Sequence, residues 1–308
     1  MFDTRKGEAL LAVIEGGSFE QAAQDLNLTP SAISQRISAL EGELGTPLLV
    51  RSKPCRATPA GQKLLQYLRR SCMLEQEFMA DMAAGTSAPL TLTLAANHDS
   101  LATWLLPALA DFLMAEQILL DIRLDDQDHT FALLAQGLAL AAIASDATPM
   151  RGCSALPLGI MRYLLLATPA FAARWFPSGL QREAARVAPL MVFDRKDDLQ
   201  AVFLQRELGL PAGSTPTHFI PSSDAFVQAI RLGLGYGLVP QLQAQTLLAS
   251  GELLDLVPGK SVDVALFWHT WRVQSPRMER LSAQLLLAAG QMLLPLAAAD
   301  QAPAGGPR

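Results

Sequence analysis

The sequence predicts an α/β protein in three parts: a small helical head that carries a hairpin, a long linker helix, and a two-lobed body. The head region is basic, with seven Lys or Arg against two acidic residues from Thr29 to Arg70. From Met73 to the end, 15 basic residues stand against 22 acidic ones. Apolar residues recur at helical spacing up to about residue 84, and from residue 90 short apolar strands alternate with helices.

Composition predicts a globular protein of the cytoplasm. Half of the 308 residues are apolar, the formal charge is −5, and no apolar run of about 18 residues predicts a membrane span. A charged-then-apolar leader is not expected at the N-terminus, because Asp3, Arg5, Lys6 and Glu8 interrupt the pattern. The three cysteines, Cys55, Cys72 and Cys153, are odd in number and far apart, so neither a disulfide framework nor a metal site is expected.

The head, residues 2–58, is predicted to hold three short helices. The first runs from about Thr4 to Ile14. Ser18 can cap the second helix, and Thr29, followed by a proline, starts the third. The third helix carries apolar residues at spacings of four, three and four, which place them on one buried side: Ile33, Ile37, Leu40 and Leu44.

The other side of the third helix suits the major groove of double-stranded DNA. Two short helices, a turn and a third helix with small polar residues near its start are typical of a helix-turn-helix, here about residues 19–38. Small side chains let the backbone approach the bases, Gln can bond adenine, and Arg can bond guanine or phosphate. A helical bundle that does not bind DNA is the alternative. The residues predicted to contact DNA are Ser31, Ser34, Gln35, Arg36 and Ser38.

A basic hairpin follows the third helix. Residues 47–51 are predicted to form a strand, residues 52–54 a tip, and residues 55–57 the returning strand. Such a wing can contact phosphate or enter the minor groove. The alternative is a hairpin whose charge is incidental. The basic residues that the wing presents are Arg51, Lys53 and Arg56.

Residues 59–84 are predicted to form one long helix, and residues 85–89, rich in Gly, Ser and Pro, a hinge. Glu75 is the one polar exception in a heptad pattern of otherwise apolar or thiol side chains. A seam this narrow suits pairing with a second copy of the same helix, so we expect a homodimer. The alternative is packing against the chain's own body. The seam residues are Leu65, Leu68, Cys72, Met79 and Met82.

Residues 90–296 are predicted to form two lobes joined by crossing strands, as in periplasmic binding proteins. The alternation of strand and helix predicts a parallel sheet covered by helices. Lobe 1 takes about residues 90–162 and 267–296, and lobe 2 about 163–266. The Ala/Pro/Gly-rich tail, residues 297–308, is predicted to be disordered. Strands are expected at 90–96, 118–124, 138–145, 163–168, 190–193, 217–220, 236–239 and 262–268.

Three strand ends carry polar side chains where open α/β sheets bind ligands. Helix N-termini at Ser100 and Ser223 suit a carboxylate, whereas Asp99, Asp194 and Asp224 could hold a cation. A site that offers both suits an amino acid, above all a basic one. The alternative is that these aspartates only cap helices and form turns. The three segments are NHDS (97–100), FDRKDD (193–198) and PSSDAF (221–226).

A resemblance to a known family covers nearly the whole chain up to about residue 290. The stretch SFEQAAQDLNLTPSAISQRISALEGELGTPLLVR resembles the winged helix-turn-helix of LysR-type transcriptional regulators. The segments NHDSLATWLLPAL, FDRKDD, SSDAFVQ and LASGELLDLVPG are similar to the ArgP/LysG subgroup, the lysine- and arginine-responsive regulators also named chromosome replication initiation inhibitor. The resemblance implies a two-lobed effector domain, a dimer seam in the linker helix, and genes of basic amino-acid export or metabolism as targets.

The resemblance also implies the site residues. A small effector, lysine or arginine, is expected without any cofactor, metal or catalytic residue. Tetramers formed through the effector domains are expected, RNA polymerase is a further candidate partner, and no membrane is involved. The implied effector-binding residues are Asn97, Asp99, Ser100, Phe193, Asp194, Ser222, Ser223 and Asp224.

Other function classes stay open as alternatives. An enzyme would need a catalytic motif, but the histidines are scattered, and neither HExxH, GxSxG nor a Walker loop occurs. GLGYG (233–237) follows a predicted helix and precedes a strand, the wrong order for a dinucleotide loop. Two other candidates remain. One is a LysR-type regulator of another small molecule, and the other is an architectural protein that binds DNA or the replication origin without operator preference.

Overall fold

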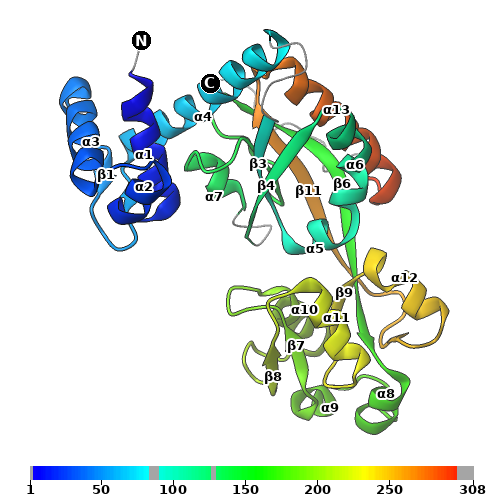
Figure 1. Ribbon diagram of the computed structural model, residues 1–308. Helices are drawn as coiled ribbons and strands as arrows, with labels where there is room; N and C mark the ends of the chain where they lie inside the picture. Colours follow the sequence, from blue (N-terminus) through cyan, green and yellow to red (C-terminus); the bar gives the residue numbers. More distant parts are fainter. Residues whose placement is uncertain (1–2, 83–89, 126–129, 297–308) are drawn as a thin grey trace, which may run out of the picture.

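The computed structural model describes residues 3–82, 90–125 and 130–296. A head, a linker helix and two lobes follow one another, and the helix joins the head to lobe 1 (Figure 1). The predicted hinge at 85–89, the last two residues predicted for the linker helix, the residue at position 2 and the predicted tail at 297–308 lie outside the described residues.

The head contains the three predicted helices and the predicted hairpin. Thr29 caps the third helix, since its side-chain oxygen accepts a hydrogen bond from the backbone N–H of Ala32 at 3.2 Å. Ile33, Ile37 and Leu40 are 0–1% exposed, and burying each such side chain stabilises the head by about 1.5–3 kcal/mol. The elements are α1 (Thr4–Gly16), α2 (Phe19–Asp25), α3 (Pro30–Leu44), β1 (Leu49–Val50) and β2 (Arg56–Ala57).

The linker helix α4 (Pro59–Met82) does not present the predicted seam as one continuous face. Leu65 and Leu68 are buried in the core of the head, so this half of the pattern packs against the chain itself. Met79 and Met82, in the later half of the pattern, are 58% and 69% exposed and can contact another molecule. The heptad pattern therefore combines two different contacts, which helical spacing alone does not distinguish.

Side-chain contacts fix α4 against lobe 1. The Gln66 side chain donates a hydrogen bond to the carbonyl oxygen of Ala135 at 2.6 Å, and Ser275 donates to the buried Glu77 carboxylate at 2.5 Å. Gly137 has a φ of +70°, and a Cβ there would lie 2.7 Å from the backbone nitrogen of Gln66. The close approach needs glycine, and it couples the position of the head to lobe 1.

Lobe 1 has a mixed sheet rather than the predicted parallel one. Strands β3 (Leu90–Ala96), β4 (Ile118–Leu124) and β5 (Ala141–Ala144) are parallel. Strands β6 (Cys153–Ala167) and β11 (Val262–Trp271) run antiparallel to each other, and both extend from one lobe into the other (Figure 1). The predicted lobe boundaries fall inside these two strands. The helices of lobe 1 are α5 (His98–Ser100), the π-helix η1 (Leu101–Leu105), α6 (Leu106–Ala115), α7 (Thr130–Ala135) and α13 (Pro276–Met292).

Lobe 2 is built on the far half of β6. Strands β9 (Gly237–Pro240) and β10 (Leu254–Asp255) pair with β6, and β7 (Leu190–Val192) runs parallel to β8 (Thr217–Phe219). The sequence did not predict the first ten residues of β6, nor helices α9, α10 and α12. The helices of lobe 2 are α8 (Pro169–Trp175), α9 (Arg182–Val187), α10 (Leu199–Leu208), α11 (Ser223–Arg231) and α12 (Gln241–Ala249).

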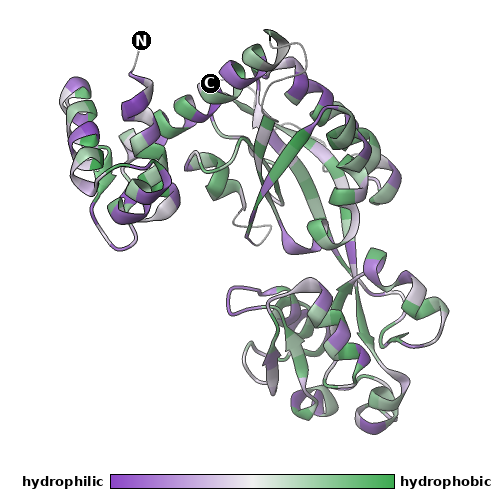
Figure 2. Cartoon of the chain, in the orientation of Figure 1, coloured by the Kyte–Doolittle hydropathy of each residue, from purple (hydrophilic) through white to green (hydrophobic). Residues whose placement is uncertain are grey.

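Hydropathy follows this architecture. Apolar residues follow the central strands of lobe 1, while the outer helices alternate between polar and apolar sides (Figure 2). Within the described residues, none of the helices combines the length and the apolar character that crossing a bilayer requires.

Candidate functional site

The polar side of α3 faces solvent. Ser31, Gln35 and Ser38 are exposed, and Ser34 and Arg36 are half-buried. The opposite side of α3 packs into the core of the head, which fixes the orientation of the helix and keeps these polar side chains at the surface. The arrangement leaves one row of small and hydrogen-bonding side chains free to enter a groove of DNA.

The hairpin stands beside α3 and presents three exposed basic residues. Arg51, Lys53 and Arg56 form no ion pair with any carboxylate in the described ranges. The Glu41 carboxylate of α3 accepts hydrogen bonds from the backbone N–H of Leu48 at 2.7 Å and of Leu49 at 3.3 Å. This contact fixes the wing relative to α3, so that positive charge and the polar helix side act as one surface.

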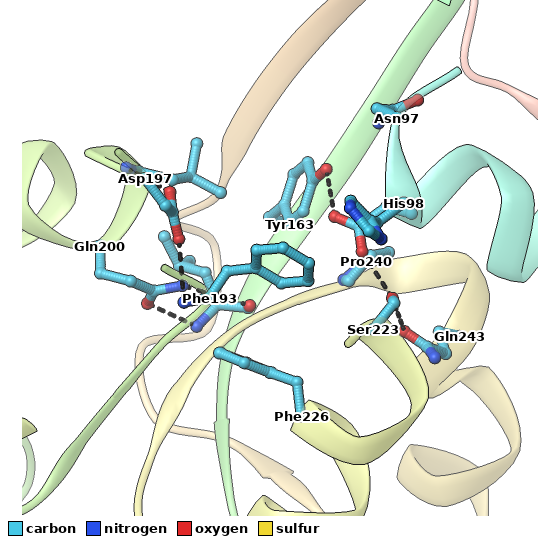
Figure 3. A pocket seen from close by; sticks show the side chains of 13 residues that line it. Asn97, His98, Tyr163, Phe193, Asp197, Gln200, Ser223, Phe226, Pro240 and Gln243 are labelled. Carbon is cyan, nitrogen blue, oxygen red and sulfur yellow. Dashed lines mark hydrogen bonds between the residues drawn. The ribbon is translucent and has the colours of Figure 1, made fainter. Parts of the chain in front are cut away.

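A pocket lies between the two lobes, at the ends of the strands (Figure 3). The space between its walls is about 530 Å³, a figure that includes open solvent at the mouth. Four of the eight predicted effector residues line it: Asn97, Asp99, Phe193 and Ser223.

Asp99 connects three elements at this pocket. Its carboxylate accepts a hydrogen bond from the Tyr163 hydroxyl at 2.8 Å and one from the Ser223 hydroxyl at 2.5 Å. Asp99 belongs to lobe 1, Tyr163 to the crossing strand β6, and Ser223 to lobe 2. Burial raises the pKa of Asp99, an effect that the two hydroxyl donors and His98 only partly oppose. The Asp99 carboxyl group therefore connects the two lobes through hydrogen bonds. Its ionised form is disfavoured unless a positive charge lies close to it.

Asp197 supplies a second carboxylate. It accepts hydrogen bonds from the backbone N–H of Leu199 at 2.9 Å and of Phe193 at 3.3 Å. Burial raises its pKa, and the negative charges of Asp99 and Asp194 raise it further. Two carboxyl groups with raised pKa values face one pocket, and a bound cation would favour the ionised form of both.

The structure does not bring the other four predicted residues into the pocket lining. Ser100 lies inside a helix that begins at His98, and its hydroxyl accepts from the Trp104 side chain at 3.1 Å. Asp194 caps its own turn, since it accepts from the backbone N–H of Lys196 at 2.7 Å. Ser222 is the exposed N-cap of α11, and Asp224 is exposed and accepts from the Gln243 side chain at 3.1 Å.

Sequence reasoning missed several lining residues. His98 and Phe193 face each other across the lobes, with ring centroids 4.8 Å apart. Gln243 comes from α12, which was not predicted, and Tyr163 lies in the middle of a strand rather than at its end. The missed residues are His98, Tyr163, Asp197, Leu199, Gln200, Phe226, Leu238, Pro240 and Gln243. Among the described residues, no group of three or more His, Cys, Asp or Glu side chains could hold a metal ion.

Comparisons with family models cover both halves of the chain. Residues 5–62 match the bacterial regulatory helix-turn-helix of the LysR family, and residues 87–289 match the LysR substrate-binding domain.

Curated and solved relatives extend over the same length. The chain is 43% identical over 288 residues to the HTH-type transcriptional regulator ArgP of Aeromonas salmonicida, covering 93% of this chain and 96% of that protein. The crystal structure of ArgP from Mycobacterium tuberculosis is 39% identical, with a TM-score of 0.81 over 96% of this chain and 100% of that one. Full-length LysG from Corynebacterium glutamicum with the effector Arg bound is 36% identical, with a TM-score of 0.75 and the same coverage. The chain belongs to the LysR family of DNA-binding transcriptional regulators.

Proposed function

We propose that this regulator binds a basic amino acid, arginine or lysine, in the interlobe pocket, and that the ligand controls how the head binds promoter DNA. The observation that carries the proposal is the pair of half-buried carboxyl groups, Asp99 and Asp197, whose pKa values are both raised and which line one pocket. Among the described residues that line this pocket, none is Lys or Arg. An anionic pocket of this kind favours a ligand with more than one positive charge.

Arginine and lysine carry two cationic groups, the α-ammonium and the side chain, so each carboxylate can receive one. Asn97 and Gln243 also line the pocket, and their side-chain amides can donate to the ligand's own carboxylate. The LysG structure, solved with Arg bound, supports the same ligand class for this chain.

The ligand would act on lobe geometry. In the present structure the Asp99 carboxylate of lobe 1 accepts a hydrogen bond from the Ser223 hydroxyl of lobe 2. A ligand cation that binds Asp99 in place of this hydroxyl changes the contact between the lobes. Because α4 is fixed to lobe 1, a change in the effector domain reaches the head. Such coupling typically amounts to about 1–3 kcal/mol.

The remaining assignments are part of the proposal. DNA is contacted by the predicted residues of α3 and the wing, within a head of residues 2–58. The linker helix, residues 59–84, pairs two chains through its exposed half, which includes Phe78 and Met79, and effector domains of residues 90–296 assemble tetramers. The targets are genes of basic amino-acid export or metabolism, where RNA polymerase is a further partner.

A thermal-shift panel of the twenty amino acids, extended by citrulline and norleucine, tests the ligand class. Arginine and lysine are expected to raise the melting temperature by mass action, whereas citrulline and norleucine, analogues whose side chains are uncharged, are not. Equal shifts with norleucine and lysine would contradict the role given to the two carboxylates. A shift with a non-basic amino acid alone would point to a regulator of another pathway.

A further inference from the structure

A second pocket lies at the joint between α4 and lobe 1. Its walls come from α4, from the end of β11 with the loop that follows, and from the start of α13. It encloses about 400 Å³, its open mouth included, and shares no lining residue with the interlobe pocket. Met73, Leu140 and Met278 give it an apolar interior.

Thr270 places an unsatisfied hydroxyl in this pocket. The residue is 1% exposed, and its Oγ1 has no hydrogen-bond partner among the described residues. A buried hydroxyl without a partner is destabilising, and native proteins avoid it unless the group has another role. A ligand that accepts from this hydroxyl would supply the missing partner.

Arg70 gives the same pocket its charge. The guanidinium lies 4.6 Å from the ring centroid of Trp271, which holds it at the pocket, and it forms no ion pair with a described carboxylate. Arg70 is the only charged side chain among the described lining residues. Glu77, farther along α4, is not part of the lining and is already bound by the Ser275 hydroxyl. The charge of this pocket is thus opposite to that of the interlobe pocket.

We propose that the joint pocket is a second ligand site, which binds a small aliphatic carboxylate. The aliphatic part would lie among Met73, Leu140 and Met278, and the carboxylate would accept from the Thr270 hydroxyl and face the Arg70 guanidinium. Such a ligand touches α4 and lobe 1 together. It therefore stabilises the present arrangement of the linker helix and biases the position of the head.

Calorimetry on the full chain, with isocaproate as the probe and isocaproamide as the uncharged control, tests this site. Isocaproate is expected to bind and its amide to bind more weakly. Thr270→Val keeps the shape of the side chain and removes the hydroxyl, so isocaproate binding should weaken about fivefold. The same variant should melt about 2–4 °C higher without ligand, because the unsatisfied group is gone. Arg70→Met, a second variant, should abolish the preference for the carboxylate over the amide.

Arginine binding measured on the same variants separates this site from the proposed function. Isocaproate should bind equally well when arginine is present in excess, and Thr270→Val should bind arginine as the unmodified chain does. The proposal is overturned if isocaproate does not bind at millimolar concentration, if Thr270→Val binds it unchanged, or if arginine displaces it competitively. None of these outcomes bears on whether arginine occupies the interlobe pocket.

Discussion

Replacing Gln35 or Arg36 by alanine is expected to abolish the preference of this regulator for its operator over unrelated DNA. Both side chains lie on the solvent side of α3, and neither contributes to the buried core of the head. Each lost base contact costs about 1–3 kcal/mol, and a dimer on a two-fold site loses it twice. Fluorescence anisotropy with operator and scrambled duplexes at one fixed salt concentration measures this ratio.

Arg5→Ala is the matched control for the loss of one positive charge. Arg5 is exposed on α1, next to Lys6, which pairs with Glu43 near the far end of α3. The control should lower binding to both duplexes slightly and equally, if at all. If Gln35→Ala and Arg36→Ala behave like Arg5→Ala, α3 is not the helix that reads the bases. That outcome would favour an architectural protein without operator preference.

Asp99→Asn is expected to weaken arginine binding by a factor of roughly 30 or more, because losing one partner of a buried charge pair costs about 2–5 kcal/mol. Asparagine has the same shape and can still accept from the Tyr163 hydroxyl, so the fold should survive. Asp197→Asn should act in the same direction. Calorimetric titration with arginine measures both affinities.

The matched control for these two variants is Asp255→Asn. Burial raises the pKa of Asp255 as well, and it accepts a backbone hydrogen bond from Val257 at 2.9 Å, but it does not line the interlobe pocket. Arginine affinity should be unchanged in this variant. Equal losses in Asp99→Asn and Asp255→Asn would mean that the effect is one of general stability.

The raised pKa of Asp99 also predicts how protein stability and arginine affinity change with pH. A carboxyl group whose pKa rises above 3.8 on folding stabilises the ligand-free protein most below that pH, and this stability is lost as the pH rises through the raised pKa. Arginine needs the ionised carboxylate, so its affinity should increase over the same pH interval. Asp99→Asn should remove this part of the dependence.

The head could be predicted closely because its signals are local. The caps at Ser18 and Thr29 and the stripe of Ile33 and Ile37 depend on neighbours a few residues away. The linker helix shows the limit of this reasoning. Leu65 and Met79 occupy equivalent heptad positions, yet the tertiary structure buries the first in the head and leaves the second exposed.

The interlobe pocket was only half predictable for a related reason. Asn97 and Asp99 follow directly after the end of β3, where open α/β sheets place ligand groups. Tyr163 faces the pocket from the middle of β6, because this strand crosses between the lobes there. Asp194 and Asp197 belong to the same acidic segment, and only the folded turn decides that Asp194 caps it while Asp197 faces the pocket.

The most direct test of the central claim is the affinity of arginine for the free regulator and for the regulator bound to operator DNA. A ligand in the interlobe pocket that controls the head must bind these two states differently, and by linkage it must change DNA affinity by the same factor. We predict a difference of about 5- to 150-fold, abolished by Asp99→Asn. Identical arginine affinities with and without operator DNA would contradict the account.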